Sequence, residues 1–527
     1  MQAMAITVSG DGVGGRGVGR GLCAAMLTLV GLLASALPAR PARADGWHGF
    51  GGDAQHTAMS PVAAQEMNRM RWSTPVDLQP PYSGQSLLIH YGSPLVTRRN
   101  TVLIPVKTGA TDGFRVEARR GDSGELLWMQ PTDYTLPVHG WVPSLGPTLT
   151  RRERLIIPGA GGTIYRRVLP DHATGFTSQR AFYGIKNYQA NPRAFNDNVR
   201  ISTPITTDAR EVAYFGFVTT DSAPLGLQSG VGRVTAGRGS AWIAAPTAAG
   251  DDSIRKVVYN CAPALSLDGA RLYIAVTDAD ESGLGAGYLL ALDSRTLAPL
   301  ARVRLKDVVN SDKDAVLSDD GTTSPTVGPD GDVYFGVIEN PPGSHHLRGW
   351  LLHFDALLSQ VKTPAAFGWD DTASIVPAAA VPSYTGASSY LLMSKYNNYA
   401  EGGGDGVNKF AVLDPNDTMM DPLSGATVMR EVLTVVAPTP DPLAREDGFP
   451  NAVKEWCINT GVVDPQSKSA FVNNEDGFLY RWDFTTNTLA SSVQITWGLF
   501  EAYTPTIIGP DGTVYAISNG ILFAIGR

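Results

Sequence analysis

Short apolar strands separated by turns recur along this chain of 527 residues, and long helical periodicity is hard to find. One phrase repeats. A small residue followed by Pro leads into a short apolar strand, then a turn that is often Asp-Gly, then a second strand with Tyr or Phe. The clearest copies are residues 323–335, 504–515 and 262–273. Asp-Gly between apolar runs is a strong hairpin signal, because Gly accepts the positive φ that tight turns need.

The repeat predicts eight copies of one unit. Seven copies begin at a proline and one begins near Asn459; the prolines are Pro94, Pro147, Pro204, Pro263, Pro325, Pro382 and Pro505. A second hairpin follows the first, and two hairpins make a four-stranded antiparallel meander. One meander cannot bury both of its faces, whereas neighbours stacked around a ring bury them for each other. We therefore predict an all-β fold, an eight-bladed β-propeller.

The two ends of the chain indicate how this ring closes. Residues 520–525 form a third strand with no fourth strand behind it, and residues 69–76 look like an outer strand. The N-terminal segment near Trp72 is therefore predicted to complete the last blade. A pair of β-sandwich sheets with long loops is the alternative architecture.

Residues 1–44 are predicted to be a signal peptide. They combine two arginines, an apolar run at residues 22–37 and a small-x-small site at residues 42–44. An uncleaved membrane anchor is the alternative, although the apolar run is shorter than the roughly 20 residues of a typical span. The remainder, residues 45–527, is predicted to be a single domain with no later membrane-spanning stretch, exported to the periplasm or the cell exterior.

Charge and cysteine usage exclude several function classes. The chain carries a net charge of −8, and −11 without residues 1–44, which hold four basic side chains and one acidic. An acidic chain is a poor candidate for nonspecific nucleic-acid binding. Only Cys261 and Cys457 follow the signal segment, with no CxxC pair for a thioredoxin-like, haem or cysteine-zinc site. They fall three blades apart, which favours free thiols, although export permits a disulfide.

The repeat phrases resemble those of the PQQ-like (pyrroloquinoline-quinone-type) propeller family. Residues 118–128 (ARRGDSGELLW) keep the Ala, Gly and Trp of the family phrase, and residues 47–57 are similar to the start of such proteins. The resemblance covers about residues 46–527 and implies the propeller fold. For the dehydrogenases of the family it also implies a quinone above Ca²⁺, Glu, Asn and Asp ligands, an Asp base, and often a disulfide between adjacent cysteines. This chain has no adjacent cysteines, and no motif assigns the ligands to its residues.

In a propeller, the residues just before each innermost strand line the mouth of the central channel. Aromatic and amide side chains there suit a ligand or a peptide segment, or they simply fill the neck and hydrogen-bond each other. The candidate binding residues are His90, Tyr91, His139, Trp141, Asn198, Arg200, Tyr259, Asn260, Tyr396, Asn397, Trp456, Asn459, Glu501 and Tyr503, with Glu455, Glu475 and Asp476 adding charge.

No catalytic motif is found, and no catalytic residue or metal ligand is predicted. The His345-His346 pair is predicted to lie in an exposed loop. Our preferred hypothesis is a noncatalytic binding or scaffold platform with no cofactor, whose protein or small-molecule partner the sequence does not identify. A PQQ- and calcium-dependent oxidoreductase is the first alternative. A hydrolase or lyase acting on extracellular sugars is the second, and it needs paired carboxylates that face each other in the channel.

Overall fold

The computed structural model describes residues 45–527 except 85, 238, 281–282 and 498–504. The predicted signal peptide therefore lies outside the described residues, as do the candidates Glu501 and Tyr503. The described residues belong to one compact unit. Among the described residues, no helix is both long and apolar enough to cross a bilayer.

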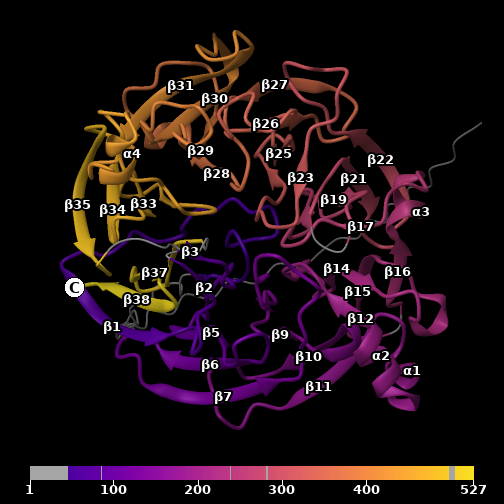
Figure 1. The fold of residues 1–527 in the computed structure, drawn as a ribbon. Helices are drawn as coiled ribbons and strands as arrows, with labels where there is room; N and C mark the ends of the chain where they lie inside the picture. Colours follow the sequence, from indigo (N-terminus) through magenta and orange to yellow (C-terminus); the bar gives the residue numbers. More distant parts are fainter. Residues whose placement is uncertain (1–44, 85, 238, 281–282, 498–504) are drawn as a thin grey trace, which may run out of the picture. The chain divides into compact units, whose positions relative to one another are not determined.

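Eight antiparallel sheets follow one another around a ring, six of four strands and two in which a pair of short strands takes the innermost position, so the predicted eight-bladed propeller is confirmed (Figure 1). Blades 1 to 4 consist of β4 (Leu95–Val96), β5 (Thr101–Lys107), β6 (Phe114–Arg120) and β7 (Leu126–Thr132); β8 (Thr148–Leu149), β9 (Leu155–Pro158), β10 (Thr163–Arg167) and β11 (Thr177–Ala181); β12 (Val199–Ile201) with β13 (Thr206–Thr207), β14 (Ala213–Thr219), β15 (Gly230–Val234) and β16 (Ala241–Ala244); and β17 (Lys256–Val257) with β18 (Ala264–Leu265), β19 (Arg271–Thr277), β21 (Gly287–Asp293) and β22 (Pro299–Arg304).

Blades 5 to 8 consist of β24 (Thr326–Val327), β25 (Val333–Val337), β26 (Trp350–Phe354) and β27 (Val361–Ala365); β28 (Ser374–Pro377), β29 (Tyr390–Tyr396), β30 (Lys409–Met420) and β31 (Thr427–Val436); β32 (Val462–Asp464), β33 (Ser469–Asn473), β34 (Phe478–Asp483) and β35 (Thr488–Gln494); and β36 (Ile507–Ile508), β37 (Val514–Ser518), β38 (Ile521–Gly526) and β1 (Arg69–Pro75). The remaining elements are the pairs β2 (Tyr82–Ser83) with β3 (Ser86–Leu87) and β20 (Leu284–Gly285) with β23 (Leu317–Ser318), and the short helices α1 (Ile185–Ala190), α2 (Pro192–Asn198), α3 (Ala245–Ala249) and α4 (Pro442–Glu446).

The N-terminal strand closes the ring, as predicted. Strand β1 pairs antiparallel with β38, the last strand of the chain. Trp72 of β1 packs against Tyr515 of blade 8, with ring centroids 5.8 Å apart, and its indole N–H donates to the Gly121 carbonyl of blade 1 at 2.9 Å. One side chain thus joins the last blade to the first.

The tyrosine of the repeat has a structural role in linking blades. In blades 3 and 4 it lies on the second strand, fully buried, and its hydroxyl donates to a carbonyl of the next blade: Tyr214 to Ser294 at 2.9 Å, and Tyr273 to Ala356 at 2.7 Å. In blade 5 the Tyr334 hydroxyl lies 2.6 Å from that of Tyr390. A buried hydroxyl needs such a partner, so the repeat encodes contacts between blades as well as strands.

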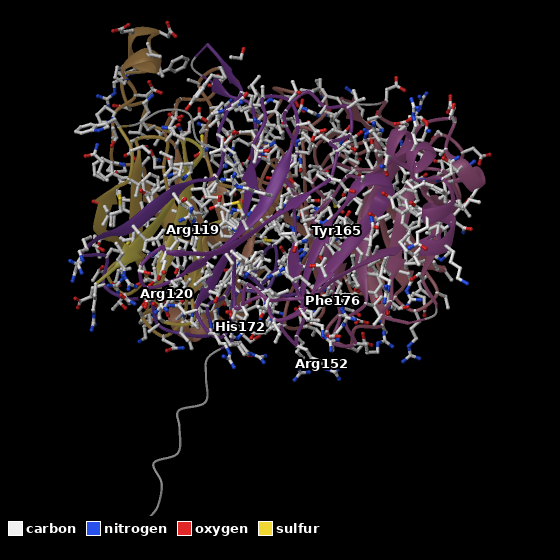
Figure 2. All side chains as sticks on the ribbon, turned by 90° about the horizontal axis from the view of Figure 1, so that it is seen from below. Arg119, Arg120, Arg152, Tyr165, His172 and Phe176 are labelled. Carbon is white, nitrogen blue, oxygen red and sulfur yellow. The ribbon has the colours of Figure 1, made fainter. Side chains whose placement is uncertain are left out.

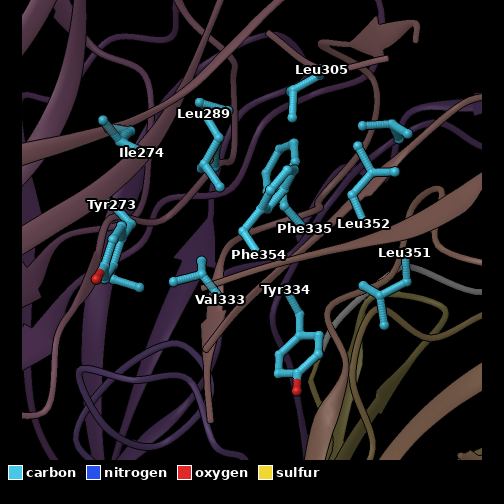
Figure 3. Packing of buried hydrophobic residues seen from close by; sticks show 14 of the residues in the cluster. Tyr273, Ile274, Leu289, Leu305, Val333, Tyr334, Phe335, Leu351, Leu352 and Phe354 are labelled. Atoms are coloured by element: carbon cyan, nitrogen blue, oxygen red, sulfur yellow. The ribbon is translucent and has the colours of Figure 1, made fainter. Parts of the chain in front are cut away.

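Apolar side chains fill the spaces between neighbouring blades. Figure 3 shows Leu289 of blade 4 beside Phe335 and Phe354 of blade 5, and all three are at most 1% exposed. Burying one such side chain contributes about 1.5–3 kcal/mol to folding. Each sheet therefore buries its two faces against its neighbours.

Two sequence-based expectations need correction. Blade 6 begins at β28, not near Pro382, because Ala373 precedes this strand where most blades have proline. Pro382 instead lies in a turn in which the Tyr384 N–H donates to the Val381 carbonyl at 3.0 Å.

The second correction concerns His345, which does not lie in an exposed loop. Its side chain is 2% exposed, stacks on Trp350 and lies 3.0 Å from the Asp421 carboxylate.

Residues 47–60, which we call the collar, run along the inner wall of the ring. Their carbonyls accept hydrogen bonds from the second residue of six innermost strands, in chain order around the axis. The donors are the N–H groups of Val96, Leu149, Leu265, Val327, Ile375 and Val463, and the acceptors are Trp47, His48, Ala54, Gln55, Thr57 and Ala58, at 2.6–2.9 Å. Blade 3 is skipped. The collar therefore obstructs one end of the channel, the end at which the first hairpin of each blade lies.

Candidate functional site at the channel mouth

The neck of the channel lies at the other end of the innermost strands. Four of the predicted residues line it, together with repeat prolines and one collar residue; they are His90, Tyr91, Asn260 and Asn459, with Pro147, Pro204, Pro505 and Phe50. The space that these side chains leave is only about 10 Å³. A cavity of that size holds about one water molecule.

An acidic loop between blades 4 and 5 reaches across this neck. The Asp320 carbonyl lies 2.8 Å from Nε2 of His90, and its carboxylate accepts from the Trp141 N–H at 2.8 Å. His90 and Trp141 stack with ring centroids 5.3 Å apart. Burial lowers the pKa of His90, which favours the neutral ring at neutral pH. These contacts hold blades 1 and 2 to the opposite side of the ring.

Asn260 makes a second bridge across the neck. Its side-chain oxygen accepts from the Ser144 N–H at 3.0 Å, and its amide nitrogen donates to the Gly321 carbonyl at 3.2 Å. Asn260 is 2% exposed, so both halves of its amide are used inside the protein. The geometry is that of a filled, hydrogen-bonded neck.

The other predicted residues in the described part of the chain do not line this space. Tyr396 is buried beside Phe367, and Asn397 donates to the Trp456 carbonyl at 3.3 Å, which joins blades 6 and 7. Trp456 is 0% exposed, in edge contact with the ring of Phe410. Four of the remaining candidates form hydrogen bonds with nearby groups of the chain; they are Asn198, Arg200, His139 and Asp476. The ring of Tyr259 lies under the Lys256 ammonium.

Glu455 and Glu475 do come together, at the start of blade 7. Their carboxylates and the Cys457 thiol each offer an atom within 4.8 Å of the others. Burial, followed by the charge of Glu475, holds the pKa of Glu455 well above its ordinary value, and burial also raises the pKa of Glu475. The ammonium of Lys454 lies 3.5 Å from Glu475. The pair therefore favours sharing a proton.

Sequence reasoning missed the ion pairs beneath the mouth. Lys256 bonds to Asp319, and Lys395 lies 3.5 Å from Asp370; all four side chains are at most 6% exposed. Isolated lysines and aspartates inside strands and loops carry no sequence signal of burial. Their partners are 63 and 25 residues away in the chain, so only the ring brings them together.

Asp371 gives a pH-dependent prediction. Burial raises its pKa to about 7, so between about pH 4 and 7 the folded state holds a proton that the unfolded chain has lost. The contribution of Asp371 to the free energy of unfolding is therefore fully present below pH 4. It falls by up to about 4 kcal/mol as the pH rises to 7. Asp371→Asn is expected to flatten this decline in urea unfolding across the window. Parallel curves for the variant and the wild type would contradict the assignment.

The two cysteines are also placed by the ring. Cys261 and Cys457 are both buried, and neither forms a disulfide in the described part of the chain. Burial raises the pKa of Cys261 to about 12, which leaves it protonated and unreactive at neutral pH.

Comparison with known proteins gives a likeness of structure and none of sequence. No protein-family profile matches the chain. No curated protein sequence matches it significantly.

Solved structures do match. A europium-containing methanol dehydrogenase aligns with a TM-score of 0.52 and 10% identity over 89% of both chains. The quinohemoprotein alcohol dehydrogenase of Comamonas testosteroni aligns at 0.51 and 9% identity, over 92% of this chain and 77% of its own. One from Pseudomonas putida HK5 aligns at 0.51 and 11%, over 92% and 76%. The chain therefore shares its β-propeller fold with these solved structures. At such identities the likeness is one of fold.

The resemblance of the repeat phrases to those of PQQ-like propellers raises the question of whether the residues here could hold the quinone. The described part of the neck has about 10 Å³ of space, and small-molecule sites measure about 300–1,000 Å³. His90 and Trp141 stack on each other and leave no slot for a planar ring between them. In the described residues, the neck does not fit a resident quinone.

Proposed function

We propose that this protein is a noncatalytic binding platform, exported as residues 45–527 after removal of residues 1–44. The observation that carries the proposal is the filled neck. Phe50 of the collar, His90 and Asn260 line a neck that leaves only about 10 Å³ of space. Their polar atoms bond to other parts of the chain, which makes the neck a structural element of the ring.

The binding surface that we propose is the mouth above the neck, with the loops of blades 6 and 7. Glu455 and Glu475 are partly exposed there, and the carboxylate of Asp441 adds a further negative charge that raises the pKa of both. A surface that disfavours ionised carboxylates favours a ligand that brings a positive charge. A cationic group of a protein or small-molecule partner fits this requirement.

Titration with PQQ and Ca²⁺ tests the proposal. We expect no quinone absorbance to remain with the protein after gel filtration, and no dye-linked oxidation of methanol, ethanol or glucose. A stoichiometric quinone complex that turns over any of these substrates would overturn the noncatalytic assignment in favour of an oxidoreductase. A PQQ-dependent dehydrogenase reconstituted in parallel controls for the activity of the cofactor stock.

A carboxylate-based hydrolase is the second candidate, and the Glu455–Glu475 pair favours it. Two facing carboxyl groups with raised pKa values are the groups that general acid–base hydrolysis uses. Assays on aryl glycosides and polysaccharides test this candidate. Hydrolysis that Glu455→Gln and Glu475→Gln each abolish would establish it, and hydrolysis that survives both substitutions would exclude the pair.

A further inference from the structure

The collar leaves a gap at blade 3, on the face of the ring opposite the mouth. It bonds to blade 2 through the His48 carbonyl and next to blade 4 through the Ala54 carbonyl. Between these two points the collar turns away from the innermost strand of blade 3. The gap opens into a cavity of about 350 Å³, within the range of small-molecule sites.

The floor of this cavity includes a residue, Thr207, whose backbone N–H has no hydrogen-bond partner among the described residues. In blade 3 the N–H of Asp208 donates to the Val212 carbonyl, so by antiparallel register the N–H and carbonyl of Thr207 point away from β14. The corresponding residues of six other blades bond to the collar there. No described residue bonds to the N–H of Thr207. The Nε2 atom of His48, also buried in the lining, has no partner either.

The charged groups of the lining are of both signs. Arg151 is exposed and makes no hydrogen bond or ion pair with any described residue. Across the cavity lie the exposed carboxylates of Asp53 and Asp268. Each already accepts bonds from neighbouring turn residues and keeps lone pairs for a ligand, because a carboxylate has about four acceptor sites.

These groups select the chemistry of a ligand. An anion would face two carboxylates, and a cation would face Arg151 and the Thr207 N–H. A neutral molecule rich in hydroxyls satisfies both, because each hydroxyl donates to a carboxylate and accepts from a guanidinium or an N–H. The apolar part of the lining, which includes Phe50 and Leu149, suits the carbon face of a ring.

We infer that this cavity is a binding site for a neutral saccharide of one or two rings. The site is formed by the collar and by the first hairpins of blades 2, 3 and 4. It is separate from the mouth, since the neck lies between them. Its occupation would add the hydrogen bonds that the collar omits at blade 3.

Isothermal titration with glucose, galactose, maltose, cellobiose and sucrose tests the inference, with glucuronate and glucosamine as charged probes. We expect at least one neutral sugar to bind with a Kd in about the millimolar range or tighter. Arg151→Gln is expected to weaken that binding about tenfold or more, because it removes a charged donor. Arg152→Gln is the matched control. Arg152 is the next residue of the same hairpin, lies at the lower edge of the ring in Figure 2 and is not part of the lining, so its loss should leave binding unchanged.

A second variant addresses the backbone position. Thr207→Pro removes the N–H that points into the cavity and no bond between the strands of blade 3; it also removes the hydroxyl that donates to the Leu149 carbonyl at 3.4 Å, which Thr207→Val removes alone. Thr207→Pro is therefore expected to bind more weakly than Thr207→Val, with a melting temperature close to that of Thr207→Val. The inference is overturned if none of the neutral sugars binds, if only a charged probe binds, or if Arg151→Gln binds as well as Arg152→Gln.

Discussion

A chain that lacks residues 45–75 is expected to lose its folded ring. This deletion removes the six carbonyls with which the collar accepts hydrogen bonds from innermost strands. At about 0.5–1.5 kcal/mol for each bond, their loss costs about 3–9 kcal/mol. It also removes β1, which leaves the edge of β38 unpaired and the contact between blades 8 and 1 without Trp72. The total stability of a protein is about 5–15 kcal/mol, so little or none remains.

Size-exclusion chromatography and thermal unfolding of the deletion variant measure this effect. A chain that begins at residue 45 is the matched control and is expected to be soluble, monodisperse and cooperative in unfolding. Deletion of the collar alone, residues 47–60, should give an intermediate melting temperature because β1 still closes the ring. A melting temperature within a few degrees of the control for the chain without residues 45–75 would show that neither segment holds the ring.

Lys256→Met is expected to destabilise the protein by about 3–5 kcal/mol, because it leaves the carboxylate of Asp319 buried without its cation. Lys256 is 4% exposed and Asp319 is 3% exposed, and the ammonium also lies 4.1 Å from the centre of the Tyr259 ring. Burial lowers the pKa of Lys256 and raises that of Asp319, so each partner depends on the other to stay charged.

Urea unfolding provides the measurement, and the exposed pair of Lys306 and Asp314 provides the control. These side chains lie 2.8 Å apart and are 45% and 28% exposed, so Lys306→Met should cost less than about 1 kcal/mol. Adding Asp319→Leu to Lys256→Met should recover part of the loss, since no buried charge is then left alone. Equal losses of unfolding free energy for the two lysine substitutions would mean that the buried pair contributes no more to stability than the exposed pair.

The blade boundaries show how far local pattern reaches. Where Pro precedes the first strand and Asp-Gly follows it, as at β24 and β36, the predicted and observed strands agree closely. Blade 6 was misplaced because alanine stands before its first strand and a turn proline follows. A strand boundary can be predicted from the sequence when the residues that produce it are adjacent in the chain. His345 shows the reverse case, because Trp350 and Asp421 bury it from five and 76 residues away.

The sequence by itself determined the eight blades, their antiparallel meanders and the closing strand at Trp72, because hairpin turns and alternating apolar strands are local consequences of residue order. Only the tertiary structure decided what fills the axis. Phe50, His90 and Asp320 meet there from the collar, from blade 1 and from the loop before blade 5. Their meeting depends on where the ring places segments that are far apart in the chain. The same placement fills the neck and opens a cavity at blade 3.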